Sequence, residues 1–152
     1  MYIVGFHFDL YRKTTGTKSV LQDYSWWIEL VKNIANQADN FEIRCWSDEP
    51  EAIATGQKFG MQLENIETTE LVFQGSISEV FLEHIYEDGF DENGGLKCFT
   101  INFYQGEELL FHSGHYGTEL YVLLKTEEEV HKLEQWSKQY PIISRVDRYE
   151  EL

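Results

Sequence analysis

The stretch "LKCFTINFYQGEELLFHSGHYGTELYVLL", from Leu96 to Leu124, decides the fold class of this chain. It holds three apolar runs of strand length, LKCFTINFY, ELLFH and TELYVLL, and each connection between them contains glycine. Aromatic and β-branched residues favour strands, and short connections containing glycine are typical of antiparallel neighbours. We therefore predict antiparallel strands over most of this half of the chain.

Upstream of this stretch, the segment Val80–Glu87 allows two interpretations. Residues 71–77, LVFQGSI, predict a strand, and "DGFDENGG" at 88–95 has the glycines and Asx residues that a hairpin loop needs. We favour a hairpin that pairs Val80–Glu87 with Leu96–Tyr104. The alternative is a helix over Ser78–Tyr86, because its apolar residues also share one helical face.

The N-terminal half predicts two strands and two helices. Tyr2–Phe8 and Phe41–Trp46 have the composition of strands. Between them we predict a helix over Val20–Asp39, opened by a capping box of Ser19 and Gln22. Such a helix is long enough for a crossover, which would allow the two strands to be parallel neighbours. A weaker helix is expected from Pro50 to about Gly60.

At the C-terminal end, Thr126 and Glu129 predict a second capping box, and Pro141 ends the helix that follows. Residues 142–146, IISRV, predict a short last strand. Together these elements indicate an α+β fold over residues 1–152 as a single domain. We expect a mixed, mostly antiparallel sheet of about six strands with two long helices packed on one face.

The charge is strongly negative. Twelve Lys and Arg residues stand against 27 Asp and Glu residues, which gives a net charge of −15. This excess disfavours direct binding to nucleic acids and to anionic membranes. It is concentrated in residues 59–96, which contain no basic residue and nine acids: Glu64, Glu67, Glu70, Glu79, Glu83, Glu87, Asp88, Asp91 and Glu92. Segment 59–96 is either a solvated face or a docking surface for a basic protein.

The leading functional hypothesis is a non-enzymatic acidic protein that docks a basic protein partner. One concrete version is an immunity or inhibitor protein for a nuclease-type toxin, whose phosphate-binding surface is basic. The expected binding residues are Glu87, Asp88, Asp91 and Glu92. Trp26 lies off the apolar stripe of its predicted helix, so it either packs beside a strand end or stands exposed as an apolar anchor.

The alternative hypothesis is a small metal-dependent or acid–base enzyme that uses His112 and His115. These histidines lie three residues apart, and Glu119 follows four residues later. Strand parity places His112 opposite either Thr118 or Glu119, depending on the length of the loop. A zinc site needs three or four converging ligands, so a structural hairpin is the simpler interpretation.

Other signals are weak or absent. The sequence has no phosphate-binding glycine motif, no GxSxG motif and no calcium loop in register, and we expect no cofactor. The N-terminal residues lack a basic leader and no run has the length of a membrane span, so we expect a cytoplasmic protein. A homo-oligomer through Trp26 and Leu30 is a third hypothesis.

Overall fold

A computed structural model describes residues 1–9, 12–15 and 18–151 of the chain. In the first half of the chain, the elements are β1 (Tyr2–Phe8), β2 (Arg12–Thr15), β3 (Lys18–Leu21), α1 (Ser25–Ala35), β4 (Asn40–Cys45), α2 (Pro50–Phe59), β5 (Met61–Leu63) and β6 (Leu71–Ser76). In the second half they are α3 (Glu79–Asp88), β7 (Thr100–Gln105), β8 (Glu108–Gly114), a 3-10 turn (His115–Gly117), β9 (Glu119–Leu124), α4 (Glu127–Ser137) and β10 (Ile143–Glu151).

A large antiparallel sheet organises the molecule. Among the described residues it has eight strands in the order β10-β1-β9-β8-β7-β4-β6-β5, and β2 and β3 form a separate hairpin. The expected α+β class is therefore confirmed, while the expected count of six strands is too low. The sheet is wholly antiparallel between neighbours in the described strands, not mixed.

The parallel pairing that the sequence allowed for the first two long strands is wrong. Strands β1 and β4 run in the same direction, but β9, β8 and β7 lie between them. The helix between them in sequence is also shorter than expected, because Val20 and Leu21 belong to β3, where they pair with Lys13 and Arg12. Helix α1 then begins at Ser25, whose backbone N–H donates to the Asp23 side chain. The helix therefore does not begin at Ser19, whose backbone lies in β3.

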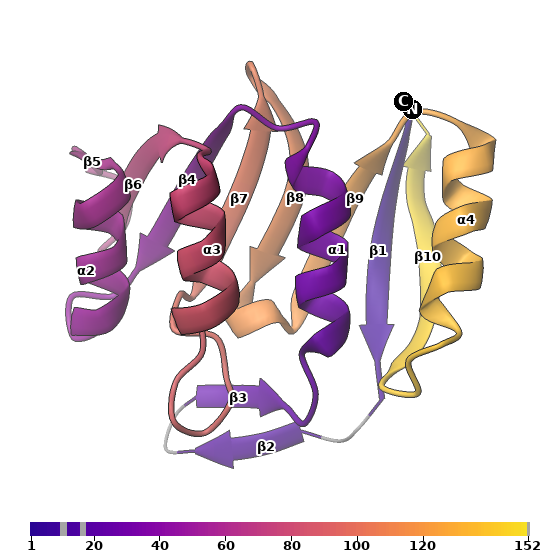
Figure 1. Ribbon diagram of the computed structural model, residues 1–152, viewed down its shortest axis with the longest axis horizontal. Coiled ribbons are helices and arrows are strands. Elements are labelled where there is room, and N and C mark those ends of the chain that lie inside the picture. The colour runs from indigo at the N-terminus through magenta and orange to yellow at the C-terminus, as the bar shows by residue number, and fades with distance from the viewer. Residues whose placement is uncertain (10–11, 16–17, 152) are drawn as a thin grey trace.

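Helices α1, α2, α3 and α4 all lie on the same face of the sheet (Figure 1). Two of them follow local signals seen in the sequence. Pro50 occupies the first position of α2, and Thr126 and Glu129 form the predicted capping box of α4. The sequence predicted two long helices on this face; among the described residues there are four, each of ten or eleven residues.

The segment after β6 is a helix, so the favoured hairpin of Val80–Glu87 with Leu96–Tyr104 is wrong. The Ser78 side chain caps α3 by accepting the backbone N–H of Phe81. Phe81 and Ile85, one turn apart, are buried against the sheet, and the Phe81 ring stacks on Phe41 with centroids 4.0 Å apart. Burial of this i, i+4 pair outweighs the strand propensity of the segment.

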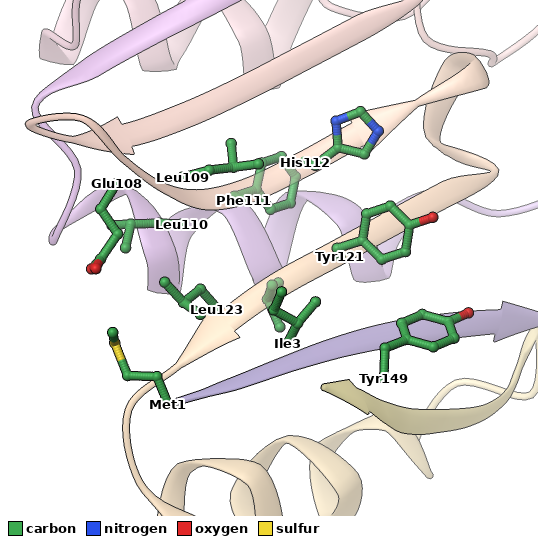
Figure 2. Close-up of a pocket in the computed structure, with 11 residues that line it drawn as sticks. Met1, Ile3, Glu108, Leu109, Leu110, Phe111, His112, Tyr121, Leu123 and Tyr149 are labelled. Atoms are coloured by element: carbon green, nitrogen blue, oxygen red, sulfur yellow. The ribbon is translucent and has the colours of Figure 1, made fainter. Parts of the chain in front are cut away.

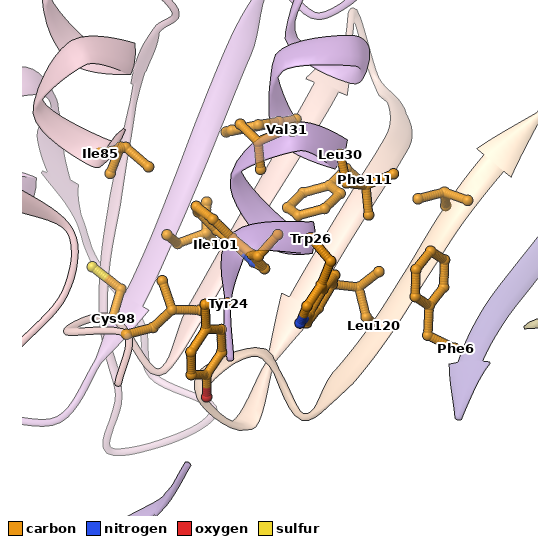
Figure 3. Close-up of a cluster of buried hydrophobic side chains, with 14 of the residues drawn as sticks. Phe6, Tyr24, Trp26, Leu30, Val31, Ile85, Cys98, Ile101, Phe111 and Leu120 are labelled. Carbon is orange, nitrogen blue, oxygen red and sulfur yellow. The ribbon is translucent and has the colours of Figure 1, made fainter. Parts of the chain in front are cut away.

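The hydrophobic core fills the space between the helices and the sheet (Figure 3). Every second residue of a strand faces it, for example Val4 and Phe6 of β1 and Phe41 and Ile43 of β4. Trp26 lies in this core. The core-facing side of the sheet is thus filled by the helices, and the alternate residues of each strand face the opposite side, called here the open face.

No helix in the described ranges has the length and apolar character needed to cross a bilayer. Cys45 and Cys98 are both buried.

Candidate functional site

The open face carries a line of polar side chains that crosses the sheet. Gln74 of β6 is paired in register with Glu42 of β4, and Glu42 with Asn102 of β7. Asn102 is paired with His112 of β8, and His112 with Tyr121 of β9. We call these five residues the polar row. Directly opposed side chains in an antiparallel sheet lie about 5 Å apart, so each member of the row can contact the next.

Glu42 is a buried carboxylate, only 5% exposed, and three neighbours satisfy it. Its Oε1 accepts hydrogen bonds from Arg44 Nε at 2.9 Å and Asn102 Nδ2 at 3.1 Å, and its Oε2 accepts one from Gln74 at 3.1 Å. Burial alone raises the pKa of a carboxyl group, but here the hydrogen bonds and the Arg44 charge outweigh it, so the pKa of Glu42 lies below its ordinary value. Glu42 is therefore ionised at neutral pH.

The charge on Glu42 sets the tautomer of His112. Because Glu42 needs a donor, the amide nitrogen of Asn102 faces it, and the amide oxygen faces His112 Nδ1 at 2.6 Å. An amide oxygen only accepts, so Nδ1 carries the hydrogen of the neutral ring. The proton that His112 gains or loses is consequently the one on Nε2. Orientation of an imidazole by a hydrogen-bonded partner is the arrangement that acid–base sites use.

Glu119 brings the predicted histidines together. Its Oε1 lies 3.5 Å from His112 Nε2 and its Oε2 lies 3.2 Å from His115 Nε2, while the Tyr121 hydroxyl donates to Oε1 at 3.2 Å. His112 is paired with Tyr121, so both registers expected for it are wrong. Glu119 lies two residues before Tyr121 on the same strand and therefore reaches His112 diagonally. Across the described ranges no group of three or more His, Cys, Asp and Glu side chains could hold a metal ion.

Burial lowers the pKa of His112, and the nearby Glu119 carboxylate, which acts in the opposite direction, does not offset it. The neutral ring is therefore favoured at neutral pH. Its Nε2 lone pair then faces the carboxylate of Glu119 with no hydrogen between them.

A turn with unusual backbone geometry presents His115. His115 and Tyr116 have φ values of 48° and 57°, in the left-handed region that costs a residue with a side chain about 1–2 kcal/mol. Tyr116 is held there by hydrogen bonds from its hydroxyl to Glu49 at 2.6 Å and from its N–H to the Phe99 carbonyl at 3.0 Å. These contacts outweigh the strain and hold the turn beside Glu119.

Next to the polar row, the open face contains a pocket of about 710 Å³ (Figure 2). Its lining is mostly apolar: Met1, Ile3, Glu108, Leu109, Leu110, Phe111, His112, Tyr121, Val122, Leu123 and Tyr149. Figure 2 shows His112, Tyr121 and Tyr149 at one end and Met1 and Glu108 at the other. The Tyr121 ring stacks on His112, with centroids 5.4 Å apart, and the Tyr121 and Tyr149 rings form a T-shaped pair with centroids 5.6 Å apart. The pocket and the polar row thus share His112 and Tyr121.

The residues predicted for docking lie elsewhere. Glu87 and Asp88 end α3, on the helix-covered face, and Asp91 and Glu92 follow in the next loop. Asp88 pairs with Lys97 Nζ at 3.1 Å. Asp91 accepts the backbone N–H groups of Asn93 and Gly95 at 2.9 and 3.0 Å. Two of the four acids therefore have structural roles in this loop.

Trp26 is not an exposed anchor. It is 0% exposed, its ring packs on Phe8 at 4.8 Å, and its indole N–H donates to the Asp23 carbonyl at 2.8 Å. Leu30 is buried as well, so these two residues do not form an oligomer contact. The physical reason is that α1 begins at Ser25 rather than at Val20, so the residues before Ser25 do not contribute to its apolar stripe. The stripe that the actual helix presents to the core includes Trp26 and Leu30.

Sequence reasoning missed Glu42, Asn102 and Gln74. Each is a polar residue at an alternate position of an otherwise apolar strand, such as "FEIRC" and "TINFY". That alternation is the one available signal, and it shows a strand with a second, polar face rather than a site.

Comparison with known proteins gives no further guide: no protein-family model, no curated protein and no solved structure matches this chain.

Proposed function

We propose that this chain binds a small, largely apolar molecule in the pocket of the open face, and that His112 is the acid–base group of that site. The observation that carries the proposal is that an apolar pocket and an oriented imidazole meet at one residue. A volume of about 710 Å³ lies within the roughly 300–1,000 Å³ typical of small-molecule sites, which are apolar with a few placed polar groups.

The polar row supports a functional rather than a structural role for His112. A chain of buried polar side chains is costly unless every member is hydrogen-bonded. Here Glu42 and Asn102, both buried, are bonded in a way that leaves one imidazole nitrogen, Nε2, for a ligand or a proton. This arrangement retains the acid–base part of the sequence-based alternative, with His112 rather than His115 as its centre.

Titration with Nile red, an uncharged fluorophore whose emission rises in apolar surroundings, tests the proposal. We expect saturable binding to the native chain and at least tenfold weaker binding to Leu123→Glu, which puts a charge on the pocket wall. The matched control is Met61→Glu on β5, since Met61 is 73% exposed and outside the pocket. Equal binding by Leu123→Glu and the native chain would remove the pocket from consideration.

A second proposal retains the acidic docking protein of the sequence analysis, on a narrower surface. Glu79, Glu83 and Glu87 are exposed and lie one turn apart along α3. None of the three has an ion pair among the described residues, and like charges at this spacing destabilise a helix. We propose that this stripe attracts a basic protein, such as a nuclease-type toxin, in the cytoplasm.

Binding to a purified basic nuclease across a series of salt concentrations tests this second proposal. The double variant Glu83→Lys with Glu87→Lys should bind more weakly and with a shallower salt dependence than the native chain. The control is the double variant Glu107→Lys with Glu128→Lys, which changes the net charge by the same amount at two exposed acids outside α3. If both variants lose the same affinity, only the net charge matters and the stripe is not a docking surface.

A further inference from the structure

The polar end of the open-face pocket offers hydrogen-bond acceptors to a ligand. His112 and Tyr121 line this end, and Glu119, which is not itself a lining residue, contacts both of them at its border. With the His112 ring neutral, its Nε2 lone pair and Glu119 Oε1 are two acceptors 3.5 Å apart. Two facing acceptors repel each other, and a donor group placed against both would relieve the repulsion.

The tautomer of His112 fixes Nε2 as an acceptor. Nδ1 is committed to Asn102, whose amide nitrogen is in turn committed to the ionised Glu42. His112 cannot move its hydrogen to Nε2 without breaking that chain. Burial also keeps the pKa of His112 low, so the ring stays neutral and accepting near neutral pH.

The aromatic side chains add a surface that favours positive charge. Figure 2 shows the Tyr121 ring beside His112 and the Tyr149 ring beside Tyr121, and the face of a tyrosine ring attracts a cation. No lysine or arginine side chain is among the described residues that line the pocket. Glu108 at the opposite end, Glu119 and the net charge of −15 all oppose an anionic ligand.

We propose that the ligand of this pocket is a protonated amine with an apolar body. The inference rests on the proposed small-molecule function and names the class of its ligand. The ammonium group lies against Glu119, His112 Nε2 and the tyrosine rings, and the apolar body lies along Ile3, Leu110 and Leu123. An ammonium group has three donors, which matches this set of acceptors.

Displacement of bound Nile red by three molecules with the same apolar body tests the ligand class. These are 4-phenylbutylamine, which is a cation at pH 7.5, the uncharged 4-phenylbutanol and the anion 4-phenylbutyrate. We expect the amine to displace the dye at about tenfold lower concentration than the alcohol, because a half-exposed ion pair and a cation–π contact add to the same apolar burial. The carboxylate should be the weakest of the three.

Two carboxylate variants locate the effect. Glu119→Gln should bring the amine to within about twofold of the alcohol and leave the alcohol unchanged. The control, Glu108→Gln, removes one charge at the other end of the pocket and should keep most of the preference for the amine. An equal loss in both variants would mean that net charge, not the Glu119 subsite, selects the amine, and would overturn the inference.

The outcomes separate the two levels of the argument. If Nile red does not bind to the native chain, the small-molecule function itself fails. If the dye binds and the alcohol or the carboxylate displaces it as well as the amine does, the pocket stands and the amine assignment is wrong.

Discussion

Replacing Gly114 by alanine tests whether the structure holds the His112 ring where the polar row needs it. The backbone of Gly114 is extended, with φ −110° and ψ 167°, so alanine fits the backbone without strain. The added Cβ, however, would lie 2.6 Å from His112 Nε2. The ring must therefore move, and because its Nδ1 lies 2.6 Å from the Asn102 amide oxygen, we expect the movement to break that contact.

The expected size of the effect follows from two opposing terms. Losing the His112–Asn102 hydrogen bond, with Asn102 left buried, lowers the free energy of unfolding by about 2 kcal/mol. Alanine in place of glycine in a strand raises it by about 0.5–1 kcal/mol. Gly114→Ala should thus destabilise the native chain by about 1 kcal/mol. In a His112→Ala background the clash is absent, so the same change should stabilise the chain by about 0.5–1 kcal/mol.

Urea unfolding of the four proteins of this cycle, followed by tryptophan fluorescence, gives the coupling free energy between Gly114 and His112 directly. We expect a coupling of about 2 kcal/mol from the two terms above. A cost of Gly114→Ala that is the same in both backgrounds, within about 0.5 kcal/mol, would refute the reasoning that a Cβ at residue 114 displaces the His112 ring.

Three further predictions concern stability. Phe81→Ala should lower the free energy of unfolding in urea by about 3–5 kcal/mol, because the ring is fully buried. Val80→Ala, at a neighbouring side chain that is 63% exposed, should change that free energy by less than about 0.5 kcal/mol. Similar losses in the two variants would contradict the orientation of α3. Tyr116→Phe should lower the free energy of unfolding by about 1–2 kcal/mol, because it removes the 2.6 Å hydrogen bond to Glu49. The double variant with Glu49→Gln should be almost no less stable than Tyr116→Phe alone. If the losses of the two single variants add up in thermal melts, the hydrogen bond between them is contradicted. Because the pKa of His112 in the folded chain lies below the ordinary 6.5, the unfolded chain binds that proton first, and the free energy of unfolding should decrease as the pH falls below about 6.5. His112→Gln should make this decrease smaller, as measured by urea midpoints from about pH 8 to about pH 5. A pH profile that His112→Gln leaves unchanged would contradict the pKa shift.

Local patterns in the sequence correctly predicted those helix starts that depend only on residues close together in the chain. Pro50 marks the start of α2, and the Thr126 and Glu129 pair marks the start of α4. A cap is made by residues within one turn of each other, so the chain pattern alone contains the information. The α+β class follows in the same way, from the length and composition of successive runs.

The errors lie where tertiary contacts decide between two local preferences. Ser19 and Gln22 have the pattern of a capping box, yet the β2–β3 hairpin takes residues 18–21. The segment of α3 has both strand and helix character, and contact of Phe81 with Phe41, 40 positions earlier, selects the helix. No window of the sequence contains that contact.

The polar row shows why the site was only partly predictable. His112, His115 and Glu119 are close in sequence, so their spacing alone drew attention to them. The role of His112 depends on Asn102 and Glu42, which reach it through two strand registers. A slip of one residue in either register would turn these side chains toward the core, so the row exists only in the assembled sheet.

The place of β1 in the sheet has a consequence for how the chain reaches its native state. Residues 2–8 leave the ribosome before residues 119–151, yet both neighbours of β1 in the sheet, β9 and β10, come from that later segment. Until those last strands are made, β1 has no hydrogen-bonding partner in the large sheet. We therefore expect β1 to join after synthesis, in a slow step that closes contacts more than a hundred residues apart in sequence.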